Sequence, residues 1–119
     1  MARFVLHRHI GYGGAHFDLM VETEAALATW QFGQDLTHGT WLSLPCRRLD
    51  DHRKAYLDYE GPVSQDCGQV QRVDGGTAEL IDRNDLRWRI RLEGTALAGL
   101  FELRREDPAG LDWTIHRVE

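Results

Sequence analysis

The chain has 119 residues, of which 42% are hydrophobic, and a formal net charge of −5 at pH 7. This length predicts a single domain over residues 1–119, and no apolar run reaches the roughly 20 residues of a membrane-spanning helix. The acidic balance excludes the broad basic footprint of a protein that coats duplex nucleic acid. It still allows an enzyme that contacts one strand end.

The N-terminus has no basic-then-apolar secretory leader, so we expect a cytoplasmic protein without membrane contact. Cys46 and Cys67 stand far apart and belong to no C-x-x-C motif. Their spacing predicts two reduced thiols rather than a disulfide framework or a zinc ribbon.

The first two predicted strands form a hairpin. Residues 3–10 and 15–22 both alternate as strands do, and Gly11-Tyr12-Gly13-Gly14 between them predicts a turn because glycine tolerates positive φ. One face of the hairpin is apolar and is predicted to face the core. That face holds Phe4, Leu6, Ile10, Phe17, Leu19 and Val21.

The register across this turn brings metal-ligand side chains together. If the four turn residues are unpaired, His9 faces His16 and His7 faces Asp18, with opposed Cβ atoms about 4.5–5.5 Å apart. A slip of one residue would scatter the set. Two imidazoles and a carboxylate suit Mn²⁺, Fe²⁺, Co²⁺ or Zn²⁺ and leave coordination positions open. His7 is an alternative to His9 as the ligand, and a solvated polar face without metal is the competing interpretation.

The remaining chain predicts short strands separated by turns, with a helical turn over Glu24–Ala28 as an alternative to strand there. Further strands are predicted at 28–33, 40–45, 56–60, 68–73, 77–82, 86–92, 97–104 and 111–118. Turns are predicted at Gly61-Pro62, Asp74-Gly75-Gly76, Arg83-Asn84-Asp85 and Asp107-Pro108-Ala109-Gly110. Many short strands at close spacing predict a mainly β fold, a compact antiparallel β-barrel with little helix.

Residues 86–92 alternate most clearly, with apolar side chains on one side and Arg87, Arg89 and Arg91 on the other. These arginines form either a wall that faces phosphate or, as we favour, the solvated outer surface of a barrel strand. We expect the four tryptophans to fill the core rather than to stack on bases.

A second cluster of reactive side chains lies between Asp50 and Pro62 and includes His52, Arg53, Lys54 and Tyr56. A histidine can donate a proton, an arginine can hold phosphate oxygens, and a phenol can hydrogen-bond a leaving oxygen. A charged loop that enters a strand has the same composition, so this cluster by itself does not identify a site.

Taken together, the two clusters resemble the 3′-phosphoesterase domain of bacterial DNA ligase D and its small stand-alone relatives. The similarity runs in order through the first two thirds of the chain. The matching segments are Arg3-Phe4-Val5, Arg8-His9, His16 to Glu22, Thr29-Trp30, Asp51-His52, Tyr56 to Gly61 and, more weakly, Gly68-Gln69-Val70 and Asp74 to Thr77.

The resemblance implies a β-barrel whose mouth binds a divalent metal, with Mn²⁺ favoured over Zn²⁺ or Co²⁺. It implies a hydrolase that heals 3′ ends in end-joining repair by removing a terminal ribonucleotide and then a 3′-phosphate. By position, the metal ligands fall on His9, His16 and Asp18, the phosphate-contacting histidine on His52 and the tyrosine on Tyr56. The implied partners are DNA or RNA/DNA 3′ ends and a DNA ligase or polymerase, with the chain itself a monomer.

Three cations of the family's phosphate clamp are missing, because Met20, Gln34 and Leu44 stand in their places. The candidates to supply the missing charge are Arg8, Arg53 and Lys54. We assign Arg53 to the clamp.

These departures keep two further hypotheses open. In the first hypothesis, the chain is a non-catalytic module that binds nucleic-acid ends or a partner. A lower-ranked reading is a small non-haem iron oxygenase, in which His52 or His116 completes a facial triad with the His-x-Asp pair.

Overall fold

The computed structural model describes residues 1–11, 13–63 and 68–118, so Tyr12 of the predicted turn and Cys67 lie outside the described residues. The strands are β1 (Ala2–Gly11), β2 (Gly14–Glu22), β3 (Leu27–Phe32), β4 (Ser43–His52), β5 (Gly61–Pro62), β6 (Gln69–Arg83), β7 (Arg87–Gly94), β8 (Ala98–Arg105) and β9 (Asp112–Arg117). A single 3₁₀ turn, η1 (Lys54–Leu57), precedes β5.

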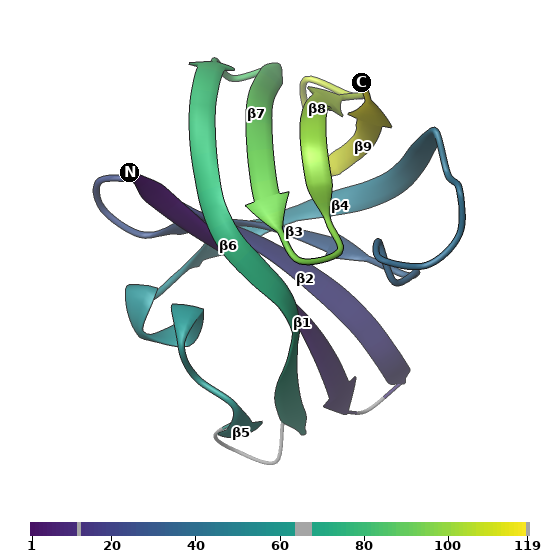
Figure 1. The fold of residues 1–119 in the computed structure, drawn as a ribbon. Coiled ribbons are helices and arrows are strands. Elements are labelled where there is room, and N and C mark those ends of the chain that lie inside the picture. The colour runs from purple at the N-terminus through teal and green to yellow at the C-terminus, as the bar shows by residue number, and fades with distance from the viewer. Residues whose placement is uncertain (12, 64–67, 119) are drawn as a thin grey trace.

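All of these strands belong to one antiparallel sheet in the order β1-β2-β3-β4-β9-β8-β7-β6-β5. A further pairing between β1 and β6 closes the sheet into a ring, and β5 pairs with the first residues of β6 below η1 (Figure 1). The predicted fold class, mainly β and compact with antiparallel strands and little helix, is confirmed. Within residues 1–11, 13–63 and 68–118, no helix is long and apolar enough to cross a membrane.

Aromatic side chains fill the inside of the ring. Trp30 is fully buried, and the rings of Trp88 and Trp113 meet it edge to face with centroids 5.1 and 5.7 Å away. The expectation that tryptophans fill the core is therefore confirmed for these three. Ile10 differs from its prediction as a core residue: it is 39% exposed, because it lies near the tip of the β1–β2 hairpin.

A smaller apolar cluster lies on the other face of the hairpin. Val5 and Met20 face each other across β1 and β2 and pack with Leu27 and with Leu57 of η1. The predicted strand at 56–60 is wrong, because the chain turns there as η1 and buries Leu57 against the sheet.

The predicted turn at Asp74-Gly75-Gly76 is also wrong, since β6 runs unbroken through it. Gly76 pairs with Phe4 of β1 and with Gly94 of β7, and a Cβ atom there would lie 2.1 Å from the Glu93 carbonyl oxygen. The glycines therefore permit close backbone approach where the ring closes, and Asp74 accepts backbone hydrogen bonds from the β7–β8 connection.

Other boundaries depart less from the predictions. β4 begins three residues later than expected and continues to His52, so the first three residues of the stretch that resembled a charged loop are strand. The helical alternative at Glu24–Ala28 does not form, because Thr23 closes a tight turn with Ala26 and β3 begins directly after it. Gly61-Pro62 forms the short strand β5 rather than a turn.

The two remaining predicted turns are confirmed. Asn84 connects β6 to β7 by accepting backbone hydrogen bonds from Leu86 and Arg87 at 2.8 and 2.9 Å. The connection between β8 and β9 is closed by the hydrogen bond from the Gly110 amide to the Asp107 carbonyl.

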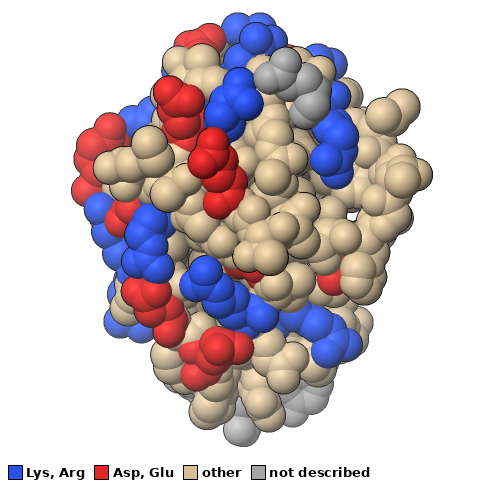
Figure 2. Space-filling model, viewed as in Figure 1, with Lys and Arg blue, Asp and Glu red and all other residues tan. Residues whose placement is uncertain are grey.

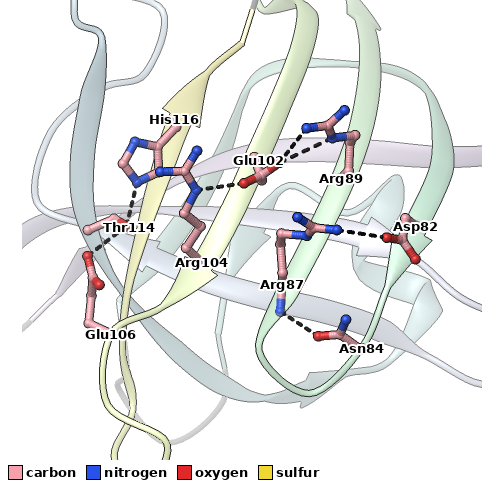
Figure 3. A network of polar contacts seen from close by, with 9 residues as sticks. All are labelled: Asp82, Asn84, Arg87, Arg89, Glu102, Arg104, Glu106, Thr114 and His116. Atoms are coloured by element: carbon pink, nitrogen blue, oxygen red, sulfur yellow. Dashed lines mark hydrogen bonds and ion pairs between the residues drawn. The ribbon is translucent and has the colours of Figure 1, made fainter.

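The arginines of β7 lie on the outside of the ring, among acids of neighbouring strands (Figure 3). Arg87 pairs with Asp82 at 3.1 Å, and Arg89 pairs with the buried carboxylate of Glu102 at 2.8 Å. Burial opposes ionisation of Glu102, but hydrogen bonds from Arg89 and Arg104 hold the pKa of its carboxyl below the ordinary value. Arg87 and Arg89 thus form an outer-surface network rather than a phosphate-facing wall.

Candidate metal centre

The β1–β2 hairpin positions the predicted metal ligands. Its register pairs His9 with His16 and His7 with Asp18, as the alternation predicts. Gly11 and Gly14 also pair, which makes the loop two residues tighter than expected without changing the register. The side chains of both cross-strand pairs, His9 with His16 and His7 with Asp18, therefore project from the same face of the hairpin.

That face is turned away from the main core. Leu6 and Leu19 point into the ring, and the residues that alternate with them, His7 and Asp18, point outward. The resemblance implies a site at the barrel mouth, whereas the structure places it on the outer face of the hairpin, on the side where η1 packs.

His9, His16 and Asp18 form a compact set of donors. Each offers one ligand atom, and these atoms all lie within 4.8 Å of one another. Asp18 Oδ2 lies 3.9 Å from His9 Nδ1, Asp18 Oδ1 lies 3.7 Å from His16 Nε2, and the two imidazole centroids are 4.5 Å apart. A divalent ion with bonds of about 2.1 Å separates its donors by roughly 3.0–3.4 Å, so the most widely separated donors of this set would have to approach by up to about 1.4–1.8 Å.

The environment of Asp18 fits a metal ligand. Its side chain is only 7% exposed, and its Oδ1 atom has no hydrogen-bond partner among the described residues. Burial raises the pKa of this carboxyl, while the positive charges of His16, His9 and His52 act in the opposite direction. A buried carboxylate oxygen without a partner is costly, and a cation between it and the imidazoles would remove that cost.

His16 is suited to ligation as a neutral imidazole. Burial lowers its pKa, Asp18 partly opposes that shift, and the charge of His9 adds to it. A metal binds the unprotonated nitrogen, so a lowered pKa removes competition from protons near neutral pH.

His7 lies beside the triad but outside it. The group of donors that come within reach of one another in the described chain contains His9 and not His7, so the geometry favours His9 over His7. His7 is 1% exposed, and its Nε2 atom has no hydrogen-bond partner among the described residues. Burial lowers its pKa to about 4, helped by the charge of Arg72 and opposed by that of Glu60.

Arg72 and Glu60 were missed by the sequence reasoning. Arg72 is the residue of β6 that pairs with His7, and its backbone amide donates to Glu60 Oε2 at 2.9 Å. Only the β1–β6 pairing that closes the ring brings these groups to the hairpin, and no local pattern in the sequence predicts that pairing.

The second predicted cluster lies on the same side of the sheet. His52 ends β4 beside Leu27, and its charge acts on both Asp18 and His7. Its Nδ1 atom lies 2.9 Å from the Asp50 carbonyl oxygen, which requires Nδ1 to donate and leaves Nε2 available. The His52 ring meets the ring of Tyr56 edge to face, with centroids 5.9 Å apart.

Arg53 and Tyr56 border a small cavity next to this histidine. The guanidinium of Arg53 lies 5.8 Å from the centre of the Tyr56 ring, and both line a cavity of about 280 Å³ with Ala55, Tyr59 and Pro62. The structure therefore brings the predicted phosphate-contacting groups together along one segment.

The three positions that depart from the family pattern have different surroundings. Met20 is 1% exposed in the apolar cluster with Val5 and Leu57, so a cation would not fit there without rearrangement. Leu44 belongs to the main core at the opposite end of β4 from His52, and Gln34 is exposed after β3.

The candidate replacement cations also differ. Lys54 donates to the Glu24 carbonyl at 3.2 Å and lies 3.7 Å from Glu22, so it is engaged away from the triad. Arg8 alternates with His9 and lies on the other face of β1. Arg53 is the candidate cation whose guanidinium lies over the Tyr56 ring.

His116 lies in the outer-surface network, where its Nε2 atom and the Thr114 hydroxyl are 2.8 Å apart (Figure 3). It is absent from the group of clustered donors found among the described residues. The geometry therefore favours His9 over His116 as the third ligand.

No protein-family model matches the chain, and no curated protein matches it.

Proposed function

We propose that this protein is a divalent-metal-dependent phosphoesterase that acts on the 3′ ends of nucleic acid. The observation that carries the proposal is the His9, His16 and Asp18 set, whose donor atoms lie within 4.8 Å of one another and include a buried carboxylate with one oxygen that lacks a hydrogen-bond partner among the described residues. The resemblance to the ligase D phosphoesterase domain supplies the substrate class and the preference for Mn²⁺.

In this proposal, His9 and His16 hold the ion as neutral imidazoles and Asp18 as a carboxylate. When bound, the ion would polarise a phosphoryl oxygen and lower the pKa of a ligated water. The chain's own contribution is to keep the three donors dry and preorganised, because Asp18 is buried and both imidazoles are largely covered.

The second cluster would handle the phosphoryl group. The hydrogen bond to Asp50 orients His52 and leaves its Nε2 atom to contact the phosphoryl group and, when protonated, to give a proton to the leaving oxygen. Arg53 would hold a phosphate oxygen, and the hydroxyl of Tyr56 would orient it.

The charge distribution favours recognition of an end rather than of a long duplex. The net charge is −5, and acidic and basic side chains are interspersed on the face shown in Figure 2. Proteins that track duplexes need an extended basic surface. We accordingly propose a cytoplasmic monomer that removes a 3′-phosphate or a terminal 3′-ribonucleotide and passes a 3′-hydroxyl to a polymerase or DNA ligase.

The test uses an end-labelled primer–template with either a 3′-phosphate or one 3′-ribonucleotide, incubated with Mn²⁺ or with a chelator. We expect Mn²⁺-dependent conversion to a 3′-hydroxyl, lost in H16A and retained in H38A. His38 is the matched control, because its side chain is 82% exposed and lies outside the cluster. Conversion that survives in H16A, or that ignores the chelator, would contradict the metal assignment.

A second candidate is a module that binds ends without turnover. Its support is the apolar packing of Met20 and Leu44, which removes two cations that the family's clamp contains. Binding of a 3′-phosphorylated strand by folded protein, with no product in any of several divalent metals, would favour this candidate.

A further inference from the structure

A second charged site lies at one end of the ring, apart from the metal centre. The β6–β7 turn and the β8–β9 connection border a cavity of about 420 Å³, a size typical of small-ligand pockets. The guanidinium-bearing residues that line it are Arg48, Arg83 and Arg105, and its apolar wall includes Trp88 and Trp113.

Arg48 occupies a position that normally carries a core residue. It alternates along β4 with Leu44 and Cys46, which are both buried, so its side chain projects into the ring. Its guanidinium carbon lies over three indole rings, at 4.5 Å from the centre of Trp30 and 5.2 and 5.7 Å from Trp88 and Trp113. Its side chain is nevertheless 25% exposed, so the cation lies between the aromatic core and the cavity.

Contacts with aromatic rings hold this guanidinium but use few of its five N–H donors. Its ion pair with Asp51 spans 3.6 Å, which is longer than an ordinary N–H···O hydrogen bond. Trp30 Nε1, in the indole beneath it, is also buried without a hydrogen-bond partner among the described residues. Three guanidinium groups and this indole N–H thus line or lie beneath the cavity, together with the one carboxylate of Asp85.

The other two arginines add positive charge to the same cavity. Arg105 binds the Gly110 carbonyl, a neutral partner, at 3.0 and 3.2 Å, and Asp85 brings one carboxylate to the same lining. Arg83 lies over Trp88 at 5.3 Å and pairs with Glu24, whose side chain is 81% exposed. Burial lowers the pKa of Arg48, the Asp51 carboxylate opposes that shift, and the charge of Arg105 adds to it.

We propose that this cavity is a binding site for a phosphate monoester of mononucleotide size, separate from the metal centre. Guanidinium forks match the oxygens of a tetrahedral dianion, and three of them border one cavity beside a single lining carboxylate, Asp85. The site does not depend on the proposed phosphoesterase activity. A free nucleotide and the phosphorylated end of a strand share the recognised chemistry.

The test is a titration of metal-free protein with inorganic phosphate, adenosine 5′-monophosphate, a 5′-phosphorylated trinucleotide and adenosine. Binding is followed by indole N–H chemical shifts and by tryptophan fluorescence. We expect both phosphate monoesters or one of them to bind and adenosine to fail, and which of the two binds tighter identifies the source. Removing one charged donor should weaken binding about tenfold or more, so R48M should bind at least that much less tightly and R48K less severely.

Arg47 provides the matched control, because it is the next residue of β4 and projects, exposed, from the opposite face. R47Q should bind as the unmodified protein does. If R48M fails to fold, R83Q tests the same cavity from its exposed rim. Any one of three results would overturn the proposal. The first is phosphate binding by R48M and R83Q that is as tight as binding by the unmodified protein. The others are binding of adenosine as tight as that of its monophosphate, and no binding of any phosphate at millimolar concentration. The same titrations with D18N, which lacks one of the proposed metal ligands, show whether phosphate binding at this cavity is independent of the metal centre.

Discussion

Replacement of Asp18 by Asn should change stability in opposite directions with and without metal. In the metal-free protein the carboxylate is buried, its Oδ1 atom lacks a hydrogen-bond partner among the described residues, and burial raises the pKa of the carboxyl. A carboxyl whose pKa is raised by folding makes the folded state less stable as pH rises through that pKa. At pH 7 the ionised Asp18 therefore weakens the metal-free fold.

The magnitude follows from the burial of an unpaired polar atom, which costs about 1–3 kcal/mol and more for a charged oxygen than for an amide. We expect metal-free D18N to be more stable than the unmodified protein by about 1 kcal/mol, or about 4 °C in Tm for a chain of this length. Mn²⁺ at one hundred times its Kd should stabilise the unmodified protein by about 2.7 kcal/mol and D18N hardly at all. The order of the two proteins should thus reverse when Mn²⁺ is added.

Urea unfolding at pH 7 with chelator and with Mn²⁺ measures both effects. D35N is the matched control: Asp35 Oδ1 accepts hydrogen bonds from the Thr37 amide and hydroxyl at 2.9 and 2.7 Å, so this variant should lose about 1 kcal/mol equally in both conditions. The reasoning is refuted if D18N is less stable than the unmodified protein in chelator and Mn²⁺ stabilises neither. That result would make Asp18 a structural ion-pair partner of the histidines.

Three further predictions concern the surroundings of the site. The pKa of His7 is lowered to about 4, so the contribution of neutral His7 to stability is present above about pH 6.5 and is lost as pH falls toward 4. The loss in the free energy of unfolding should reach about 3 kcal/mol and be absent in H7Q. Urea unfolding of metal-free protein across that pH range measures it. L57A should reduce the free energy of unfolding by about 2–4 kcal/mol, because Leu57 is buried in the small cluster beneath η1, and equal stability of the variant would mean that η1 does not pack there in solution. H52Q should lower the rate of 3′-phosphate removal by about 10²–10⁴-fold while Mn²⁺ still raises Tm, whereas loss of the Mn²⁺ effect would place His52 among the metal ligands.

The hairpin shows which features can be inferred from local pattern. Alternation along 3–10 and 15–22 and the glycines between them predict the register that the structure contains, and therefore the pairing of His9 with His16. Strand pairing across a short turn involves residues that are close in the chain, so few competing registers bury the same apolar face. The same reasoning correctly places three tryptophans in the core.

The errors occur where residues distant in the chain meet. Asp74-Gly75-Gly76 has the composition of a turn but lies inside β6, because its glycines permit the close approach of β1 and β7. Tyr56 and its neighbours have the composition of a strand but form η1, because Leu57 completes an apolar cluster with residues thirty or more positions away. Neither reason is visible in a window of local sequence.

The sequence by itself determined the class of the fold and the hairpin register that brings His7, His9, His16 and Asp18 to one face, because strand period and a tight turn act over neighbouring residues. Only the tertiary structure decided that the donors lie on the outer face of the ring and that Arg72 comes beside His7. It alone also decided that Arg48 points into the ring over three indole rings. These features depend on ring closure and on the side of each strand that turns inward, which the packing of the whole chain determines.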